Sequence, residues 1–436
     1  MINFILFGSF FILLLLNVPI AASLGLSSVF AMMYGGTKFT VIPTNLYNGM
    51  AKFLLLAIPF FVISGNVMAE AGISRRLIDF IDDCVGHLKG GIAIVCVIVA
   101  MFFGAISGSG PATVAALGII LIPAMINSGG FSAPFASALM AAASSIAIVI
   151  PPSIAFVVYA SITGVSVGNM FMAGIIPGIM MGLALIAIVW IEVKRKGITA
   201  SRERSTWAHR GKTFLQALWG FLVPVIILGG IYGGVFTPTE AAAVSVVYAL
   251  IVGIFIYREI KLKNFIKIMV DSGKTTGSIM LIIGTAAVFS YVCMKFGISK
   301  AAQALLLRVS GNKYVFLIII NIIFLIAGCF VDANSAMYIF IPIMAPVAQE
   351  LGIDLVHFGV IATVNLAIGQ VTPPVGVNLF VAIGISDSLG ELRDKTRVTI
   401  TSISKAVWPM ILACIVALLL ITYVPWFSMV ILGGAG

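Results

Sequence analysis

Residues 104–118 read GAISGSGPATVAALG and set four glycines, two serines, a threonine and a proline within a long apolar region. A lipid bilayer offers no water to backbone N–H and C=O groups, and each unpaired group costs several kcal/mol there. Non-helical backbone at that depth is tolerated only where it is buried in protein or lines a cavity. If the chain spans a membrane, this segment must be a sheltered break between helices, of the kind that serves a binding site.

The composition indicates an integral membrane protein. Of the 436 residues, 61% are hydrophobic and 9% are charged, whereas soluble domains carry about 25% charged residues. Apolar runs at residues 4–16, 182–190 and 411–424 supply parts of spans, each of which needs roughly 20 residues. The first run lacks a basic start, so we expect residues 1–20 to be a retained span rather than a cleaved signal.

The net charge of +10 reports topology and contact with anionic lipid in such a chain, rather than nucleic-acid binding. The five cysteines and three histidines are scattered, without the spacing of a disulfide framework or a metal site.

Hydropathy and helix-breaking residues together predict an all-α polytopic membrane protein with about ten spans and two re-entrant helical hairpins. The expected spans lie near residues 2–21, 22–36, 52–70, 131–165, 168–193, 214–235, 238–257, 276–296, 354–387 and 405–431. The hairpins lie near residues 91–126 and 313–348, and their polar tips are SGSGP at 107–111 and VDANS at 331–335.

The two halves of the sequence repeat each other. MAEAGISRR at residues 68–76 corresponds to CMKFGISKA at residues 293–301. IVIPPSIAFVVYA at residues 148–160 corresponds to QVTPPVGVNLFVA at residues 370–382, with nearly the same offset along the chain. Because each half has five spans, an odd number, the second copy must be inverted relative to the first, as in many secondary transporters.

We therefore divide the chain into a first inverted repeat at residues 1–193, a cytoplasmic linker at 194–213 and a second inverted repeat at 214–436. With the N-terminus outside, the intracellular segments hold 19 of the 25 basic residues, which supports this orientation. Those segments are residues 71–90, 194–213, 258–275 and 388–405. The other six basic residues fall outside them and are Lys38, Lys52, Lys295, Lys300, Arg308 and Lys313.

Residues 74–88 and 260–270 alternate charged and apolar side chains at helical spacing. Each segment is expected to be either an amphipathic helix at the cytoplasmic surface or an ordinary connector.

The first polar tip is expected to separate a helix that ends near Ile106 from one that has Pro111 in its first turn. The earlier helix then offers its last carbonyl groups to a cation, and the later helix offers free N–H groups to a carboxylate. Glycine in the tip lets the backbone approach a ligand closely.

The same logic applies to three further breaks: VDANS, IPPSI at residues 150–154 and GQVTPPVGVN at residues 369–378. In VDANS, Asp332 is expected to cap the helix that begins near Asn334, and a carboxylate at this depth is also a candidate functional group. No Arg or Lys falls near any of the four breaks, so a carboxylate substrate would be held by dipoles, hydroxyl groups and coordinated cations. Weakly charged oxygen sites of this kind favour Na⁺ over divalent ions.

Five segments resemble the large membrane subunit of the tripartite ATP-independent periplasmic (TRAP) transporters: SGSGPATVAALG, IPPSI, GGVFTPTEAAAVSVVYAL, FVDANSAMYIFIPIMAP and GQVTPPVGVNLFVA. The resemblance covers essentially the whole chain. It implies a sodium-coupled, elevator-type transporter of the bacterial inner membrane that imports an organic acid. It also implies two partners, a separate small membrane (Q) subunit and a periplasmic substrate-binding protein. Within FTPTEAAAV, Thr237, Pro238 and Glu240 are expected to form a capping box, which makes Glu240 structural.

The resemblance also implies the site residues. One Na⁺ site would lie between the first hairpin tip and the first Pro-Pro break, at Ser107, Ser109, Val149 and Pro151. The other would lie between the second hairpin and the second break, at Gly328, Gly369, Thr372 and Val375. Substrate would bind between the tips, near Ser109, Ser153, Asp332 and Asn378. Near the first site this chain has Ala147 where the family often has glycine, which would be strained if an unusual backbone angle were required.

Other classes stay open at this point. A sodium/carboxylate symporter that works without a binding protein is the alternative transporter. An intramembrane serine protease needs a base within roughly 3 Å of its nucleophile, but His357 is expected at the outer end of its span and Ser107 on a hairpin that enters from inside. A channel would need a filter such as TVGYG, which is absent from the sequence. We expect no enzyme, and the cargo stays open among C4-dicarboxylates, sialic acids and other carboxylates, with sialic acid as a single guess.

Overall fold

The computed structural model describes residues 1–200, 202–388 and 398–433, and every regular element within these ranges is a helix. The first half contains α1 (Ile2–Leu15), α2 (Ile20–Tyr34), α3 (Val41–Met50), η1 (Phe53–Leu56), α4 (Ala57–Glu70), α5 (Ile73–Val85), α6 (Gly91–Ser107), α7 (Gly110–Asn127), α8 (Ala133–Ser145), η2 (Ile146–Ile148), α9 (Ile154–Thr163) and α10 (Val167–Lys196). The second half contains α11 (Trp207–Tyr232), α12 (Pro238–Ile251), η3 (Val252–Ile256), α13 (Leu262–Lys295), α14 (Ile298–Ser310), α15 (Lys313–Phe330), α16 (Ala333–Glu350), α17 (Leu355–Gly369), α18 (Val377–Ser388), α20 (Ile400–Tyr423), α21 (Trp426–Met429) and η5 (Val430–Leu432).

The prediction of an all-α polytopic membrane protein is confirmed. Within the described ranges, eight helices are long and apolar enough to cross a membrane, and several shorter apolar helices accompany them. The first two expected spans meet earlier than predicted, because Pro19 provides the N-cap of α2 and leaves a short turn after α1. The capping box expected at Thr237 is confirmed, since its hydroxyl accepts a hydrogen bond from the Glu240 N–H and the Glu240 carboxylate accepts one from the Thr237 N–H.

One predicted segment is wrong. Residues 260–270 do not form a separate interfacial helix or a connector, because α13 runs unbroken from Leu262 to Lys295. The polar residues between the two expected pieces bond within the helix instead of ending it. The Thr275 hydroxyl donates to the Asp271 carbonyl at 3.0 Å, and Lys274 pairs with the Asp271 carboxylate at 3.3 Å. The amphipathic segment is therefore the first part of a long spanning helix.

The connection between α10 and α11 is attached to α5. Helix α10 continues to Lys196 and α11 begins at Trp207, so both helices extend into the predicted linker at 194–213. The buried Asp83 of α5 accepts a hydrogen bond from the Ser205 hydroxyl at 2.7 Å and pairs with Arg202 at 3.1 Å. These contacts hold the connection against the polar face of α5.

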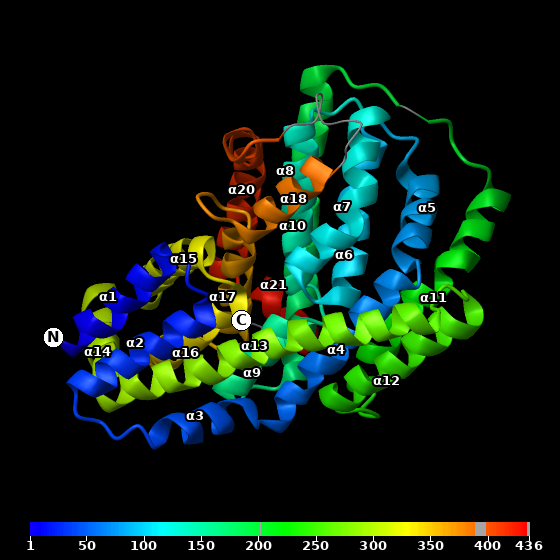
Figure 1. Cartoon of the computed structure of the whole chain (residues 1–436). Coiled ribbons are helices and arrows are strands. Elements are labelled where there is room, and N and C mark those ends of the chain that lie inside the picture. The colour runs from blue at the N-terminus through cyan, green and yellow to red at the C-terminus, as the bar shows by residue number, and fades with distance from the viewer. Residues whose placement is uncertain (201, 389–397, 434–436) are drawn as a thin grey trace.

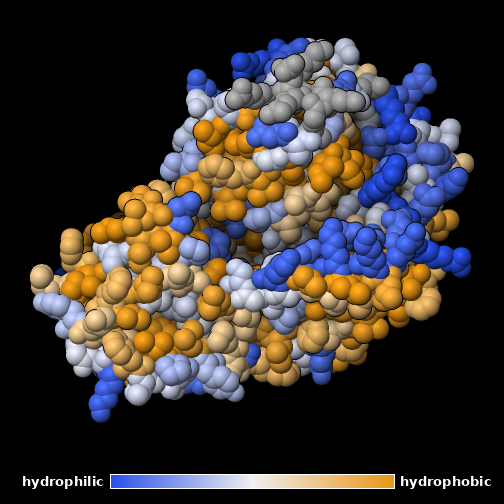
Figure 2. Space-filling model, in the orientation of Figure 1, coloured by the Kyte–Doolittle hydropathy of each residue, from blue (hydrophilic) through white to orange (hydrophobic). Residues whose placement is uncertain are grey.

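The helices form two groups that meet around the polar breaks. In one group α4 packs against α12, and α13 packs against α2 and α3. In the other, α7 and α8 pack against α18, and α15 packs against α17. Figure 1 shows α13 crossing beneath the upright helices α7, α8 and α10. In Figure 2, hydrophobic surface covers the lower lobe where α1 and α2 lie, and hydrophilic atoms gather at the top of the view, where the connection from α10 to α11 runs.

Candidate functional site

The first hairpin turns at a short tip. Helix α6 ends at Ser107, Gly108 adopts a left-handed backbone with φ of 60°, and Ser109 is extended. Helix α7 then begins at Gly110 with Pro111 in its first turn. Only glycine adopts the left-handed conformation at no steric cost, so the sequence determines where the chain reverses. This is the break predicted from the sequence.

The hydroxyl groups at this tip bond mainly to one another. The Ser107 Oγ lies 2.7 Å from the Thr113 Oγ1, and the Thr113 hydroxyl donates to the Ser109 carbonyl at 2.9 Å. The Ser109 hydroxyl makes no hydrogen bond to any residue that the structure describes. Ser109 lines a cavity of about 90 Å³ that Asn66 of α4 and Thr275 of α13 also line. A free hydroxyl at the tip therefore faces the other group of helices.

The first Pro-Pro break begins after η2 and ends at Ser153. Ser153 is fully buried, its hydroxyl donates to the Ile148 carbonyl at 2.5 Å, and it accepts from the Phe156 N–H at 3.4 Å. This residue caps α9, and in this conformation its hydroxyl is engaged by the protein. A Cβ placed on Gly108 would lie 3.2 Å from the Pro152 carbonyl oxygen, so the tip of the hairpin reaches this break.

The second hairpin is turned by a capping carboxylate. Helix α15 ends at Phe330, Val331 is extended, and Asp332 is the N-cap of α16. The Asp332 Oδ2 accepts from the Asn334 N–H at 3.0 Å and from the Ser335 N–H at 3.3 Å, and its Oδ1 accepts from the Ser335 hydroxyl. The predicted cap is confirmed, and both carboxylate oxygens already have partners within the hairpin.

We expect Asp332→Asn to retain uptake and Asp332→Ala to lose most of it. Asparagine keeps an oxygen that can accept the backbone N–H groups, whereas removing an N-cap costs about 0.5–2 kcal/mol. Thermal unfolding of the purified variants should separate the two in the same order. A stable Asp332→Asn protein without uptake would instead show that the negative charge itself contacts a transported species.

The second Pro-Pro break follows α17. The Thr372 hydroxyl donates to the Ile368 carbonyl at 2.8 Å, one turn back. Gly376 has a left-handed backbone with φ of 56°, and its N–H lies 3.3 Å from the Cys329 carbonyl at the end of α15. The break is therefore bonded to the second hairpin through the backbone.

Each hairpin packs closely against the helical segment that precedes its Pro-Pro break, and the residues in contact there are small. A Cβ placed on Gly104 of α6 would lie 2.7 Å from the Ala147 Cα. A Cβ placed on Gly369 of α17 would lie 2.5 Å from the Gly328 Cα of α15. The backbones approach this closely because neither side of the crossing carries a larger side chain. Ala147 lies in η2 and is not among the described residues with positive φ, so the strain considered for alanine at this position is absent.

The start of α7 also contacts the second break. A Cβ placed on Gly110 would lie 2.6 Å from the Gln370 Oε1 and 2.8 Å from the Asn378 Nδ2. Asn378 is fully buried, and its Nδ2 donates to the Ala141 carbonyl at 3.3 Å. The side-chain oxygens of Gln370 and Asn378 are buried without a hydrogen-bond partner among the described residues. An unpaired buried acceptor costs about 1–3 kcal/mol, so these two oxygens beside the tip are candidate hydrogen-bond acceptors for a bound molecule.

The expected site residues gather in three places. Ser109 and Asn378 flank the start of α7, and Gly328 and Gly369 form one crossing, with Thr372 and the half-buried Val375 in the break beyond it. At the first break the hairpin tip meets the Pro152 carbonyl, while the Val149 carbonyl oxygen lies against Gly174 of α10 and Pro151 lines an apolar cleft. Sequence reasoning missed Gln370 and Pro152. Their signal was present, because both lie within the motifs IPPSI and GQVTPPVGVN.

The pairing considered for a serine protease, Ser107 with His357, is not found, because each side chain has other partners. The His357 Nδ1 lies 2.7 Å from the Ser428 Oγ, and its Nε2 lies 3.3 Å from the Thr422 carbonyl oxygen. Ser107 is instead paired with Thr113 at the hairpin tip. The histidine ring is therefore held near the start of α17 and serves the packing of α20 and α21.

Comparisons with known proteins identify the family of the chain. The family model for the tripartite ATP-independent periplasmic transporter, DctM component, matches residues 7–427. The chain is 40% identical over 433 residues to the isethionate TRAP transporter permease protein DctMQ of Oleidesulfovibrio alaskensis, covering 98% of this chain and 66% of that relative. It is 40% identical over 410 residues to the C4-dicarboxylate TRAP transporter large permease protein DctM of Pseudomonas aeruginosa, covering 93% of both chains.

A solved structure shares the fold. The crystal structure of the Alcanivorax borkumensis YdaH transporter superposes with a TM-score of 0.58 and 15% sequence identity, covering 90% of this chain and 88% of that one. At this identity the likeness concerns the fold alone. The family match and the 40% identical relatives carry the assignment, and the chain belongs to the DctM family as a multi-pass large permease component of a TRAP transporter of the bacterial inner membrane, not an enzyme.

Proposed function

We propose that this permease imports an organic acid together with Na⁺, by moving the hairpins and broken helices as one block against the remaining helices. The acid would be delivered by a periplasmic binding protein, and a separate small membrane subunit would complete the assembly. The observation that carries the proposal is the pair of small-residue crossings, Gly104 with Ala147 and Gly328 with Gly369, because each brings helix ends together beside a Pro-Pro break.

Matched element boundaries support two inverted repeats. Helices α5 and α14 begin at Ile73 and Ile298, and α8 and α17 begin at Ala133 and Leu355, so the two pairs are separated by nearly equal lengths of chain. The hairpins α6–α7 and α15–α16 occupy corresponding positions between these pairs. Repeats with opposite orientation offer the same site to the two sides of a membrane, which suits alternating access.

The second crossing suits a sodium ion. Helix α17 ends at Gly369 and α15 ends at Phe330, so carbonyl groups of both last turns lack helical partners. The Thr372 hydroxyl lies in the same break, 2.8 Å from the Ile368 carbonyl oxygen, and adds a further neutral oxygen to it. In the described residues, no group of three or more His, Cys, Asp or Glu side chains that could hold a metal ion is found. Neutral oxygens without such a cluster favour a monovalent hard cation over Ca²⁺ or Zn²⁺.

A second sodium ion would bind near the first crossing, at the hairpin tip beside it. Ser107 and Ser109 lie at the tip, and the Pro152 carbonyl faces Gly108 across the break. We propose that the Pro152 carbonyl joins the two serines there, in addition to the Val149 and Pro151 groups that the family resemblance implies.

The acid would bind between the hairpin tips. The start of α7 offers backbone N–H groups and the positive end of a helix dipole, which favour a carboxylate. The Gln370 and Asn378 amides lie beside this helix end with unpaired oxygens, which suit hydroxyl groups on the cargo or a protonated ligand atom. Relatives of equal identity are named for isethionate and for C4-dicarboxylates, so the cargo is proposed only as an organic acid, and sialic acid stays a guess.

The relative named DctMQ supports a Q-type partner component. This chain matches 66% of that protein, and its name joins the M and Q components. We propose that a Q-type component supplies the counterpart of the unmatched third.

Uptake into proteoliposomes tests the proposal. The permease, reconstituted with its small subunit, should take up radiolabelled acid only when an inward Na⁺ gradient and the loaded binding protein are both present. Uptake that persists with K⁺ in place of Na⁺ would contradict sodium coupling. Uptake of free acid at the same rate without the binding protein would favour the alternative symporter.

A further inference from the structure

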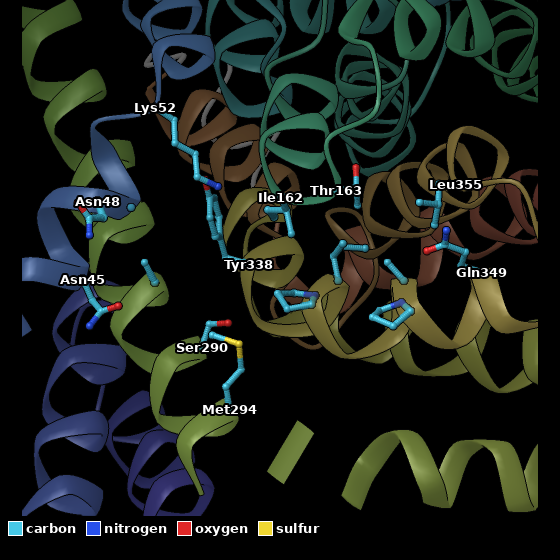
Figure 3. Close-up of a pocket in the computed structure, with 16 residues that line it drawn as sticks. Asn45, Asn48, Lys52, Ile162, Thr163, Ser290, Met294, Tyr338, Gln349 and Leu355 are labelled. Carbon is cyan, nitrogen blue, oxygen red and sulfur yellow. The ribbon is translucent and has the colours of Figure 1, made fainter. Parts of the chain in front are cut away.

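A cavity of about 480 Å³ lies between the two groups of helices (Figure 3). One wall is formed by α3 and α13, which contribute Asn45, Asn48 and Ser290. The facing wall is formed by α9, which contributes Ile162 and Thr163, and by α16, which contributes Tyr338 and Pro342. The cavity therefore lies between the helices proposed to stay fixed and those proposed to move.

Lys52 gives this cavity its charge. Figure 3 shows its side chain extending from the turn after α3 across the cavity toward Tyr338. Its Nζ donates to the Ser161 carbonyl at 2.6 Å, and the Ser161 Oγ lies 3.0 Å from the Tyr338 hydroxyl. Among the described residues that line the cavity, Lys52 is the only one with a formal charge, and no carboxylate within the described ranges pairs with it.

Lys52 is exposed, and its ammonium group has hydrogen-bond donors that no described residue uses. The ammonium has three N–H donors, of which one is used by Ser161. The side chains of Asn48, Ser290 and Gln349 also line the cavity and make no hydrogen bond to another described residue. The remaining N–H donors of the Lys52 ammonium and the amide and hydroxyl groups of these three side chains thus line the open space of the cavity.

We propose that this cavity is an outer vestibule that receives the carboxylate of the cargo, with Lys52 as the cation that attracts it before it reaches the hairpin tips. The inference rests on the proposed function and adds a binding site to it. No Arg or Lys lies near the four breaks, so Lys52 offers the acid a fixed positive charge before it reaches the site where dipoles and Na⁺ would hold it. A single lysine binds a carboxylate only weakly, which suits a vestibule because the acid must leave it again to reach the hairpin tips.

The distribution of basic residues puts Lys52 on the outer side. It lies outside the four segments that carry most of the Lys and Arg and that are predicted to be cytoplasmic. The cavity is also lined by Thr163, at the end of α9, and by Leu355, at the start of α17, which the predicted topology puts at outer ends. An acid released on the periplasmic face would therefore meet the vestibule first.

Thiol labelling tests the vestibule without requiring transport. Ser290→Cys introduces a thiol of nearly the same size as the hydroxyl that lines the cavity. Its reaction rates with an anionic reagent, 2-sulfonatoethyl methanethiosulfonate, and a cationic one, 2-(trimethylammonium)ethyl methanethiosulfonate, are measured in the complex reconstituted in nanodiscs. We expect Lys52→Gln to lower the ratio of the anionic to the cationic rate about fivefold, and Lys52→Arg to preserve it.

Two controls accompany the measurement. Thr44→Cys exchanges a hydroxyl for a thiol on the exposed side of α3, outside the cavity lining, so its ratio should not respond to Lys52→Gln. The chain without an added thiol corrects for Cys84, which is half-buried while the other cysteines are buried. An unchanged ratio at Ser290→Cys, or no reaction there at all, would overturn the proposal, since the cavity would then not attract or admit an aqueous anion.

Transport kinetics provide a second test of the role of Lys52. Lys52→Gln should raise the half-saturating concentration of loaded binding protein about fivefold and leave the maximal rate within about twofold. Lys52→Arg should restore the wild-type value. A lower maximal rate with an unchanged half-saturating concentration would contradict the vestibule and assign the Lys52 contact with Ser161 to the motion of the helices. The labelling result stands whether or not uptake depends on Na⁺, so failure of the vestibule and failure of the proposed function give different results.

Discussion

Gly369→Val should abolish sodium-driven uptake while leaving the protein in the membrane. The added Cβ would lie 2.5 Å from the Cα and 2.6 Å from the carbonyl carbon of Gly328. Both are backbone atoms, so no side chain can rotate away to make room. Overpacking of this kind costs about 1–3 kcal/mol, and it would separate α15 from α17 at the point where we propose that Na⁺ binds. We expect uptake to fall more than about tenfold.

Gly384→Val provides the matched control. Gly384 lies on α18, the helix that follows the same break, and a Cβ placed there meets no atom within 4 Å. The same glycine-to-valine change should leave uptake within about twofold of the wild type. Uptake is measured per amount of folded complex, determined by fluorescence-detected size-exclusion chromatography. Normal uptake by Gly369→Val would show that the crossing is free to widen and carries no ion site.

The breaks could be predicted from the sequence because local chemistry determines them. Glycine at position 108 permits the left-handed turn, Pro111 suits the first turn of a helix, and Asp332 satisfies the first N–H groups of α16. None of these effects depends on a distant part of the chain. The repeat was visible for a similar reason, since each half reuses the same local signals at a nearly constant offset.

The contacts across the fold could not be predicted in this way. Nothing near Gly110 indicates that it faces Gln370 and Asn378, because that proximity depends on how α7 packs against α18. For Ser153, by contrast, the sequence implies a role in the site, but the packing occupies its hydroxyl group. The family resemblance implies that it binds substrate, whereas in this structure its hydroxyl caps α9 and bonds to Ile148. A motif identifies which residues adjoin a site, but the packing decides which of their atoms are free.

The length of α13 illustrates a second limit. Residues 271–275 look like a polar boundary, yet their side chains bond to the helix itself, and the helix continues. Hydropathy averages cannot distinguish polar residues that end a helix from polar residues that a helix accommodates. The predicted interfacial segment failed for this reason.

Thr372→Val should weaken the dependence on Na⁺ without unfolding the protein. Valine has nearly the same shape as threonine, but it lacks the oxygen that we propose contributes to the second sodium site. Loss of one interaction with a charged group is worth on the order of 1.5 kcal/mol, which corresponds to about a tenfold rise in the half-saturating Na⁺ concentration. The measurement is the initial rate of uptake as a function of external Na⁺ at constant ionic strength.

Thr363→Val distinguishes a lost sodium ligand from a lost hydrogen bond. The Thr363 hydroxyl donates to the Gly359 carbonyl at 2.8 Å, one turn back on α17, just as the Thr372 hydroxyl donates to the Ile368 carbonyl at 2.8 Å. The two substitutions therefore remove the same local bond, and Thr363 is the more buried of the pair. If the bond alone mattered, Thr363→Val would be at least as damaging. If the Thr372 oxygen binds Na⁺, only Thr372→Val will shift the sodium curve, and equal shifts in both variants would exclude a ligand role for Thr372.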